Sequence, residues 1–309
     1  MTGGLVEGSF EGMENIPYVG EGFSLLTAVV WAVAVIFFKK SGEKVHPLAL
    51  NTFKNTLALV LVLPTMCLFG QNLFHQAPAS EYLLLMFSGV IGIAIGDTLF
   101  FKSLNQIGAG LTTIVVCLYS PFIIGLSVIW LGERLTILQI LGALMVILAV
   151  LSTTRKEAIG KLSRHDLLMG ILWGVLATAC MAVGIVMIKP VLNRSPLLWA
   201  TEIRLAGAVP ALAIIFLFHP LRRKIAASIA LPGSWKYTLS GSFTGAYLAM
   251  ILWLTGMKYT QASISSALNQ TSTLFVVVLA AIFLREPLTL RRTAAVTFAV
   301  LGAILVSFG

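Results

Sequence analysis

Apolar residues run along this chain in long stretches, and the charged residues gather mostly in the short gaps between them. A helix needs about 20 apolar residues to cross roughly 30 Å of hydrocarbon. Ten stretches have about this length, so the pattern predicts ten membrane-spanning helices. They cover residues 22–40, 48–69, 82–103, 109–131, 136–153, 167–188, 197–218, 237–257, 262–284 and 290–308.

The composition supports an all-α integral membrane protein. Charged residues make up 11% of the 309 residues and hydrophobic residues 58%, whereas soluble domains carry about 25% charged residues. The net charge of +9 could indicate nucleic-acid binding, but that function needs a basic face interleaved with aromatic residues or a known motif. The basic residues instead punctuate the apolar stretches, which predicts the lipid bilayer as a partner and no nucleic acid.

The pattern of reactive residues argues against an enzyme. The four histidines fall in loops or at helix ends, and neither H-E-x-x-H nor the nucleotide signature G-x-x-x-x-G-K-[ST] occurs. The three cysteines lie inside predicted helices without metal-ligand spacing. We therefore expect no cofactor and no metal.

The distribution of lysine and arginine predicts the orientation in the membrane. The loops after the first, third, fifth, seventh and ninth helices hold 15 of the 21 basic residues, and the other loops hold 4. Cytoplasmic loops retain basic residues, so both termini should lie outside the cytoplasm. Residues 1–21 form a short acidic tail without the basic patch of a secretory signal. We expect a multi-pass protein of a bacterial or archaeal plasma membrane.

The chain also repeats itself. The sequence P-F-I-I-G-L-S-V-I-W-L-G-E-R-L-T, which ends at residue 136, matches L-F-V-V-V-L-A-A-I-F-L-R-E-P-L-T, 153 positions later. The match predicts two five-helix units, residues 22–155 and 156–309. Because five is odd, the second unit enters the membrane from the opposite side. Inverted repeats are typical of secondary transporters, whose substrate site lies near the midplane between the halves.

These two stretches resemble the EamA-type repeats of the drug/metabolite transporter superfamily, and the resemblance covers nearly all of residues 22–308. Glu133 and Glu286 stand where that family has its recurrent glutamate, and Pro121 where it has the proline of the fourth helix. Leu274 replaces the proline in the second repeat, which should make the two halves unequal at the centre. The resemblance implies ten helices and the export or exchange of small organic metabolites without ATP.

An aspartate interrupts the stretch 82–103 in the sequence G-D-T-L-F-F-K. Asp97 should lie roughly 9 Å from the helix end at 1.5 Å per residue, where an ionisable group needs a cavity or a partner. Lys54 lies at a similar depth in the preceding helix, so we predict an ion pair. The pair could fasten two helices, bind substrate or relay protons. Asp97 aligns with Ala249 in the second repeat, so the symmetry of the scaffold does not require it.

The second repeat carries its own charges, Glu202 and Arg204, near the outer end of the helix 197–218. Arg204 aligns with Asn55, or with Lys54 if one gap is allowed. An arginine at this depth could clamp a substrate carboxylate through its paired donors or simply neutralise Glu202. We favour the structural role.

Polar residues at the middle of two helices predict a cavity. Proline lacks an N–H group and frees the carbonyl of Cys117, which opens the fourth helix to a ligand or water. Interhelical hydrogen bonding is the alternative, but it needs fewer polar groups than are present here. The residues expected to line the cavity are Tyr119, Ser120 and Pro121 in the fourth helix, and Asn269, Gln270 and Thr271 in the ninth.

Aromatic residues divide into two groups by position. Trp31, Tyr247 and Trp253 lie inside helices and could stack on a substrate ring. Trp199 and Trp235 lie at helix ends, which is typical of the interfacial aromatic belts. Glycines at 89, 92 and 96 and at 241 and 245 should let the third and eighth helices approach their neighbours closely. We interpret the two family glutamates as turn and end-capping residues.

These observations predict a secondary transporter that exports or exchanges small organic metabolites, such as amino acids, by alternating access. Proton coupling through Asp97 and uncoupled facilitation both remain open. A carrier of sugars or of phosphorylated or nucleotide metabolites is the alternative, with Lys54 and Arg204 as phosphate ligands, and a channel is a further one.

Overall fold

Five helices in the part of the chain that the structure describes are long and apolar enough to cross a membrane. The computed structural model describes residues 17–73, 75–131, 136–153, 162–192, 194–231, 233–259 and 268–308. The five helices lie within a few residues of predicted spans. They are α2 (Val19–Gly42), α3 (Pro47–Leu68), the composite helix Ala79–Ile107, α9 (Arg164–Val186) and α11 (Leu197–Phe218).

Two of the predicted spans are composite helices with a π-helical segment inside them. A π-helical segment bonds residue i to i+5 and occurs mostly as a short insertion in an α-helix, frequently at a functional site. The sequence did not predict these segments. The first composite is α4 (Ala79–Gly89), η2 (Val90–Asp97) and α5 (Thr98–Ile107), and the second is α13 (Trp235–Gly241), η4 (Ser242–Leu248) and α14 (Ala249–Tyr259).

The other helices are shorter. Two of them fill the predicted span 109–131, and two others match the predicted spans 136–153 and 290–308. The first part of the predicted span 262–284 lies outside the described residues. These helices are α6 (Ala109–Val116), α7 (Tyr119–Leu131), α8 (Ile137–Thr153), α10 (Lys189–Leu192), α12 (Arg222–Ile229), α16 (Ser272–Phe283) and α17 (Leu290–Phe308).

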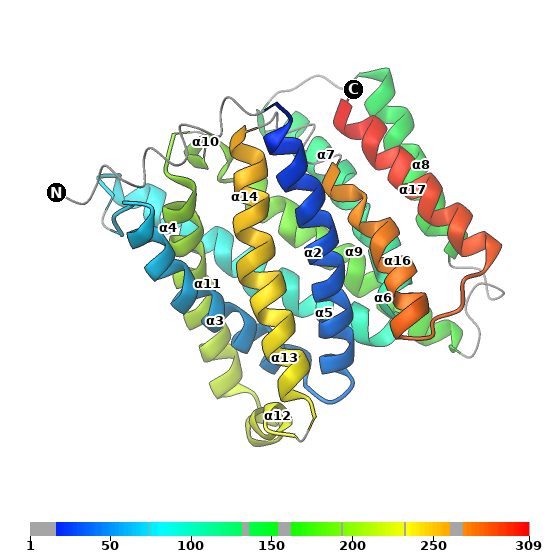
Figure 1. Ribbon diagram of the computed structural model, residues 1–309, viewed down its shortest axis with the longest axis horizontal. Helices are drawn as coiled ribbons and strands as arrows, with labels where there is room; N and C mark the ends of the chain where they lie inside the picture. Colours follow the sequence, from blue (N-terminus) through cyan, green and yellow to red (C-terminus); the bar gives the residue numbers. More distant parts are fainter. Residues whose placement is uncertain are drawn as a thin grey trace.

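Helices that are far apart in the sequence pack side by side (Figure 1). α2 packs along α13, η4 and α14, whereas α9 packs along η2 and α5. α3 contacts α11 and η4, and α11 contacts α4 and η2. α8 and α17 form a pair at one edge. α2 begins and α17 ends at the same end of the bundle, and α12 lies at the opposite end (Figure 1).

Apolar side chains cover the outside of the bundle as well as its interior. Ile129, Phe218 and Leu290 are among many large apolar residues that are largely exposed. Exposed apolar surface of this extent marks a protein that faces lipid. The interior is made largely of alanine, valine, leucine and isoleucine, and the many small alanines let the helices approach closely.

Glycines bring both π-helical segments close to their neighbours, as predicted. A Cβ atom on Gly184 of α9 would lie 3.0 Å from Gly92 Cα and 3.0 Å from the carbonyl oxygen of Ser88. A Cβ atom on Gly245 would lie 2.8 Å from Ala34 Cβ of α2. Each segment is therefore held against a helix of the other half of the chain without room for a further methyl group.

Candidate functional site

A buried ion pair joins α3 to the end of η2. Lys54 Nζ lies 2.5 Å from Asp97 Oδ2, and the two side chains are 7% and 18% exposed. The Lys54 ammonium also lies 5.5 Å from the centre of the Phe101 ring, where the negative ring face attracts a cation. The predicted pairing is therefore confirmed, whereas its functional role stays a prediction.

Amide side chains from α3 satisfy backbone groups of η2. Asn51 Nδ2 donates to the carbonyl oxygens of Ile93 and Ala94 at 3.0 and 3.2 Å. It also lies 2.9 Å from Thr98 Oγ1, and Asn55 Nδ2 donates to Asn51 Oδ1 at 2.6 Å. Buried polar groups need such partners. Sequence reasoning missed these amides, although both stand in the polar run N-T-F-K-N near the start of α3.

Arg204 reaches from α11 toward the same π-helical segment. Its Nε donates to Ser88 Oγ at 3.1 Å, and its guanidinium lies against Gly92, where an added Cβ would be 3.5 Å from Nη2. Arg204 also interacts electrostatically with Tyr119 and Asp97. Together with the ion pair, two basic side chains and one acidic side chain gather around η2, with one positive charge in excess.

Glu202 does not pair with Arg204, which corrects the prediction that the arginine neutralises it. Glu202 is 2% exposed, and its Oε2 has no hydrogen-bond partner among the described residues. The physical reason is helix geometry, because side chains two positions apart point to different faces. Arg204 therefore contacts η2 while Glu202 lies buried elsewhere on α11.

The fourth span breaks where its proline predicts a break. α6 ends at Val116 and α7 begins at Tyr119, because Pro121 has no N–H group to donate to the carbonyl of Cys117. The amide N–H groups of the two intervening residues bond three positions back instead of four. Tyr119 and Ser120 consequently lie at the start of a new helix.

The polar stretch of the ninth span meets this break. Gln270 Nε2 donates to Ser120 Oγ at 3.3 Å, so two predicted site residues from the two repeats are neighbours. Thr271 lies in a turn before α16 and donates its hydroxyl to Leu268 O, and Asn269 is half-buried. The ninth span is therefore interrupted at the position aligned with the break in the fourth, although it has leucine in place of proline. The prediction that the halves differ there is wrong for the backbone.

The three predicted pocket aromatics lie in different surroundings. Trp31 packs in the core against two phenylalanine rings at centroid distances of 6.4 and 6.5 Å. The Tyr247 hydroxyl lies 2.8 Å from Thr65 Oγ1 and so links η4 to α3. Trp253 is half-buried in α14. Their contact with a substrate stays a prediction.

Trp199 is wholly buried, so its assignment to an interfacial belt is wrong. It is 0% exposed, and its Nε1 donates to the carbonyl oxygen of Leu73 at 3.0 Å. The rings of His75 and Tyr82 each lie 5.0 Å from it, because the chain between α3 and α4 covers this end of α11. Trp235, in contrast, is exposed at the start of α13.

Glu286 caps α6, a helix of the other half of the chain. The N–H groups of Ala109 and Gly110 donate to its two carboxylate oxygens at 2.8 and 3.2 Å, as a helix N-terminus favours an anion. Gly108, with φ of 83°, turns the chain here, and a Cβ atom on it would be 2.8 Å from the carboxylate. The sequence predicted Glu286 as an end-capping residue between the ninth and tenth helices, whereas these bonds cap a helix of the other half. Glu133 lies outside the described residues.

Known proteins resemble this chain over most of its length. The family model of the EamA-like transporters matches residues 19–155 and again 168–308. Two uncharacterized transporters of Archaeoglobus fulgidus are 23% and 22% identical over 282 and 287 residues; each match covers 91% of this chain, and 95% and 96% of the relative. A protein of known crystal structure has the same fold, with a TM-score of 0.64, 17% identity, and coverage of 91% of this chain and 95% of that one. The chain therefore belongs to the EamA-like transporter family and is a multi-pass integral membrane transporter, not an enzyme.

Proposed function

We propose that this transporter has ten spans in two inverted five-helix units, residues 22–155 and 156–309, and works by alternating access. Each family match covers about one unit. The packing of α2 along η4 and of α9 along η2 is what two copies related by a pseudo-two-fold axis would produce. In transporters of this kind the substrate site lies between the units near the midplane.

The charges around η2 suit a small zwitterionic metabolite such as an amino acid. The Arg204 guanidinium can bind a carboxylate through paired donors, and Asp97 can accept an ammonium group of the substrate in exchange for Lys54. Ionisable residues inside a span mark substrate or ion pathways. The single observation that carries the proposal is the buried ion pair between α3 and η2.

Proton coupling follows naturally from the same pair. Protonation of Asp97 removes its charge and breaks the bond to Lys54, which weakens the attachment of α3 to the end of η2. A proton that enters as substrate leaves would then drive export or exchange. Tyr119, Ser120, Pro121 and the polar stretch Asn269–Thr271 would form the uncharged wall of the same cavity.

Phosphorylated metabolites are the second candidate substrates. The excess positive charge of Lys54 and Arg204 over Asp97 favours an anion, and a phosphate would use both cations. One assay can distinguish an amino acid from a sugar phosphate. Both would bind to the same basic side chains, but only the amino acid has an ammonium group that needs Asp97.

Proteoliposomes that contain a mixed pool of amino acids and sugar phosphates test the proposal under an imposed pH gradient. The parent should accumulate one class of solute, and Asp97→Asn should only equilibrate it. If the parent merely equilibrates every solute, the coupled transporter is excluded and a facilitator or channel takes its place. Asp166→Asn removes an exposed carboxylate at the start of α9 and serves as the control that should behave like the parent.

A double variant separates fastening of helices from transport. Lys54→Met with Asp97→Leu replaces the ion pair by apolar side chains, a change that buried pairs often tolerate without loss of stability. We expect an unchanged melting temperature and no solute accumulation. If accumulation persists in this variant, the pair only fastens α3 to η2.

A further inference from the structure

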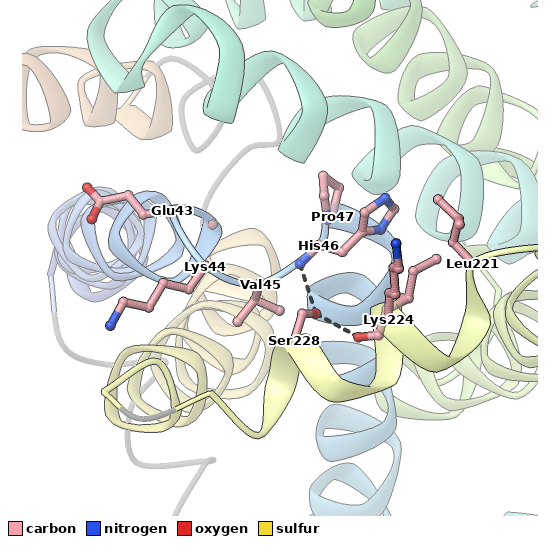
Figure 2. A pocket seen from close by; sticks show the side chains of 10 residues that line it. Glu43, Lys44, Val45, His46, Pro47, Leu221, Lys224 and Ser228 are labelled. Carbon is pink, nitrogen blue, oxygen red and sulfur yellow. Dashed lines mark hydrogen bonds between the residues drawn. The ribbon is translucent and has the colours of Figure 1, made fainter.

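A cavity opens at the α12 end of the bundle, and none of the residues that line it belongs to η2 (Figure 2). It lies between the loop that joins α2 to α3 and one side of α12. Its volume is about 330 Å³, at the lower end of the range of roughly 300 to 1,000 Å³ that small-molecule sites occupy. By the distribution of basic residues, this end of the bundle faces the cytoplasm.

A hydrogen bond joins the two walls of the cavity. The N–H group of His46 donates to Ser228 Oγ at 3.1 Å, and the Ser228 hydroxyl donates to the carbonyl oxygen of Ile225 at 2.6 Å. Ile225 is 2% exposed and anchors α12 in the core. The walls are therefore fixed in place before any ligand binds.

Donor groups gather at one end of the cavity. His46 Nδ1 accepts the N–H of Leu48 at 3.3 Å, so the neutral imidazole carries its proton on Nε2, where it can donate. The Lys224 side chain extends from α12 toward the His46 ring, while Glu43 and Lys44 lie toward the other end (Figure 2). The opposite charges of Glu43 and Lys44 offset each other. At the other end the ionisable lining residues are His46 and Lys224, and both are basic.

The surroundings of His46 are electropositive. Burial lowers the pKa of His46, and the neighbouring His219 and Lys102 lower it further. The centres of the His46 and His219 rings are 6.0 Å apart. The ammonium group of Lys102 near the ring would attract an anion bound beside His46.

We propose that this cavity binds a phosphate group between His46 Nε2 and Lys224 Nζ. Arg222 and Arg223 are exposed on the same short helix, and anionic headgroups of the cytoplasmic leaflet attract such basic segments. The phosphate can belong to an anionic lipid or to a small soluble anion. When bound, it bridges the loop before α3 to α12. This site is separate from the proposed substrate site, so it holds whether or not the proposed substrate is correct.

The experiment uses the full chain in nanodiscs of phosphatidylcholine, titrated with inorganic phosphate and, at matched ionic strength, with chloride. A ligand that binds the folded state raises the melting temperature in a saturable way, and we expect this for phosphate only. Lys224→Gln should weaken the apparent phosphate affinity about tenfold, the effect of one charge-assisted hydrogen bond. Lys236→Gln removes an exposed lysine of α13 outside the cavity and should titrate like the parent.

A second arm identifies the source of the phosphate. In nanodiscs that contain phosphatidylglycerol, loss of the phosphate response in the parent would assign the site to a lipid headgroup, and a retained response would assign it to a soluble anion. The proposal is overturned if phosphate and chloride act alike. It is also overturned if Lys224→Gln and Lys236→Gln reduce the response equally, because binding would then be diffuse surface attraction.

Discussion

The π-helical segments η2 and η4 stand at equivalent places in the two halves of the chain, yet they carry different chemistry. Both interrupt a span after its first α-helical part, and both meet a neighbouring helix at a glycine. At the end of η2 stands Asp97, which bonds to Lys54. The aligned residue just after η4 is Ala249, which is 3% exposed. The backbone geometry is therefore shared, and the charge is not.

The difference shows that the π-helical geometry does not need the ion pair. Both segments are nevertheless bonded to α3. η2 is bonded through Asn51 and through the pair of Lys54 with Asp97, and η4 through the hydroxyl groups of Thr65 and Tyr247. One of these links, the ion pair, can be broken by a proton or by a charged substrate, and the others cannot. Loss of the charge would weaken the attachment of α3 to η2, which the bonds of Asn51 still maintain, and would leave the attachment to η4 unchanged.

Placing a charge directly after η4 is the strongest test of this comparison. Ala249→Asp should reduce the free energy of unfolding by about 3 kcal/mol, because overpacking costs about 1 to 3 kcal/mol and an unpaired buried polar group about 1 to 3 kcal/mol. Arg204, the nearest counterpart of Lys54, bonds to Ser88 beside η2 and not to η4. The melting temperature of the purified protein measures the effect, with Ala249→Ser as a neutral control. Parent-like stability of the aspartate variant would mean that η4 also accommodates a carboxylate.

The positions of the spans could be predicted from the sequence because each depends only on local hydropathy. The predicted ranges 197–218 and 290–308 coincide with α11 and α17. The pairing of Lys54 with Asp97 was also predictable, since two opposite charges at similar depth in consecutive helices have few other ways to be satisfied in lipid. The prediction that Arg204 neutralises Glu202 failed because side chains two positions apart in a helix point to different faces, although they are close in sequence.

Other features depend on tertiary contacts that no local pattern encodes. A π-helical segment differs from an α-helix by one residue in its bonding, which leaves apolar runs such as V-I-G-I-A-I unchanged in appearance. The capping of α6 by Glu286 joins residues 176 and 177 positions apart. The burial of Trp199 likewise depends on the chain segment that covers it.

A smaller loss of stability is expected where η2 meets α9. Gly184→Ala should reduce the free energy of unfolding by about 2 kcal/mol, within the range for overpacking, because the new Cβ would lie 3.0 Å from Gly92 Cα and from Ser88 O, both backbone atoms. Gly22→Ala in α2 is the control, since a Cβ there meets nothing within 4 Å.

The transport assay adds a second reading of Gly184→Ala. We expect the variant to lose solute accumulation as well as stability. The reason is that the displaced backbone of η2 adjoins Arg204 and belongs to the segment that ends at Asp97. A variant that loses stability but transports normally would show that the precise packing of η2 against α9 does not matter for function.

The smallest effect is expected at the neutral link between η4 and α3. Thr65→Val keeps the shape of the side chain and removes its hydrogen bond to the Tyr247 hydroxyl, so it should reduce the free energy of unfolding by about 1 kcal/mol, within the range of roughly 0.6 to 2 kcal/mol for interhelical bonds in membranes. Tyr247→Phe should do the same, and the double variant should cost less than the sum of the two, as expected for partners in one bond. Solute accumulation should persist in all three, in contrast to Asp97→Asn. If Thr65→Val abolished accumulation as completely as Asp97→Asn, attachment of α3 in general, and not the charge at η2, would be what transport requires.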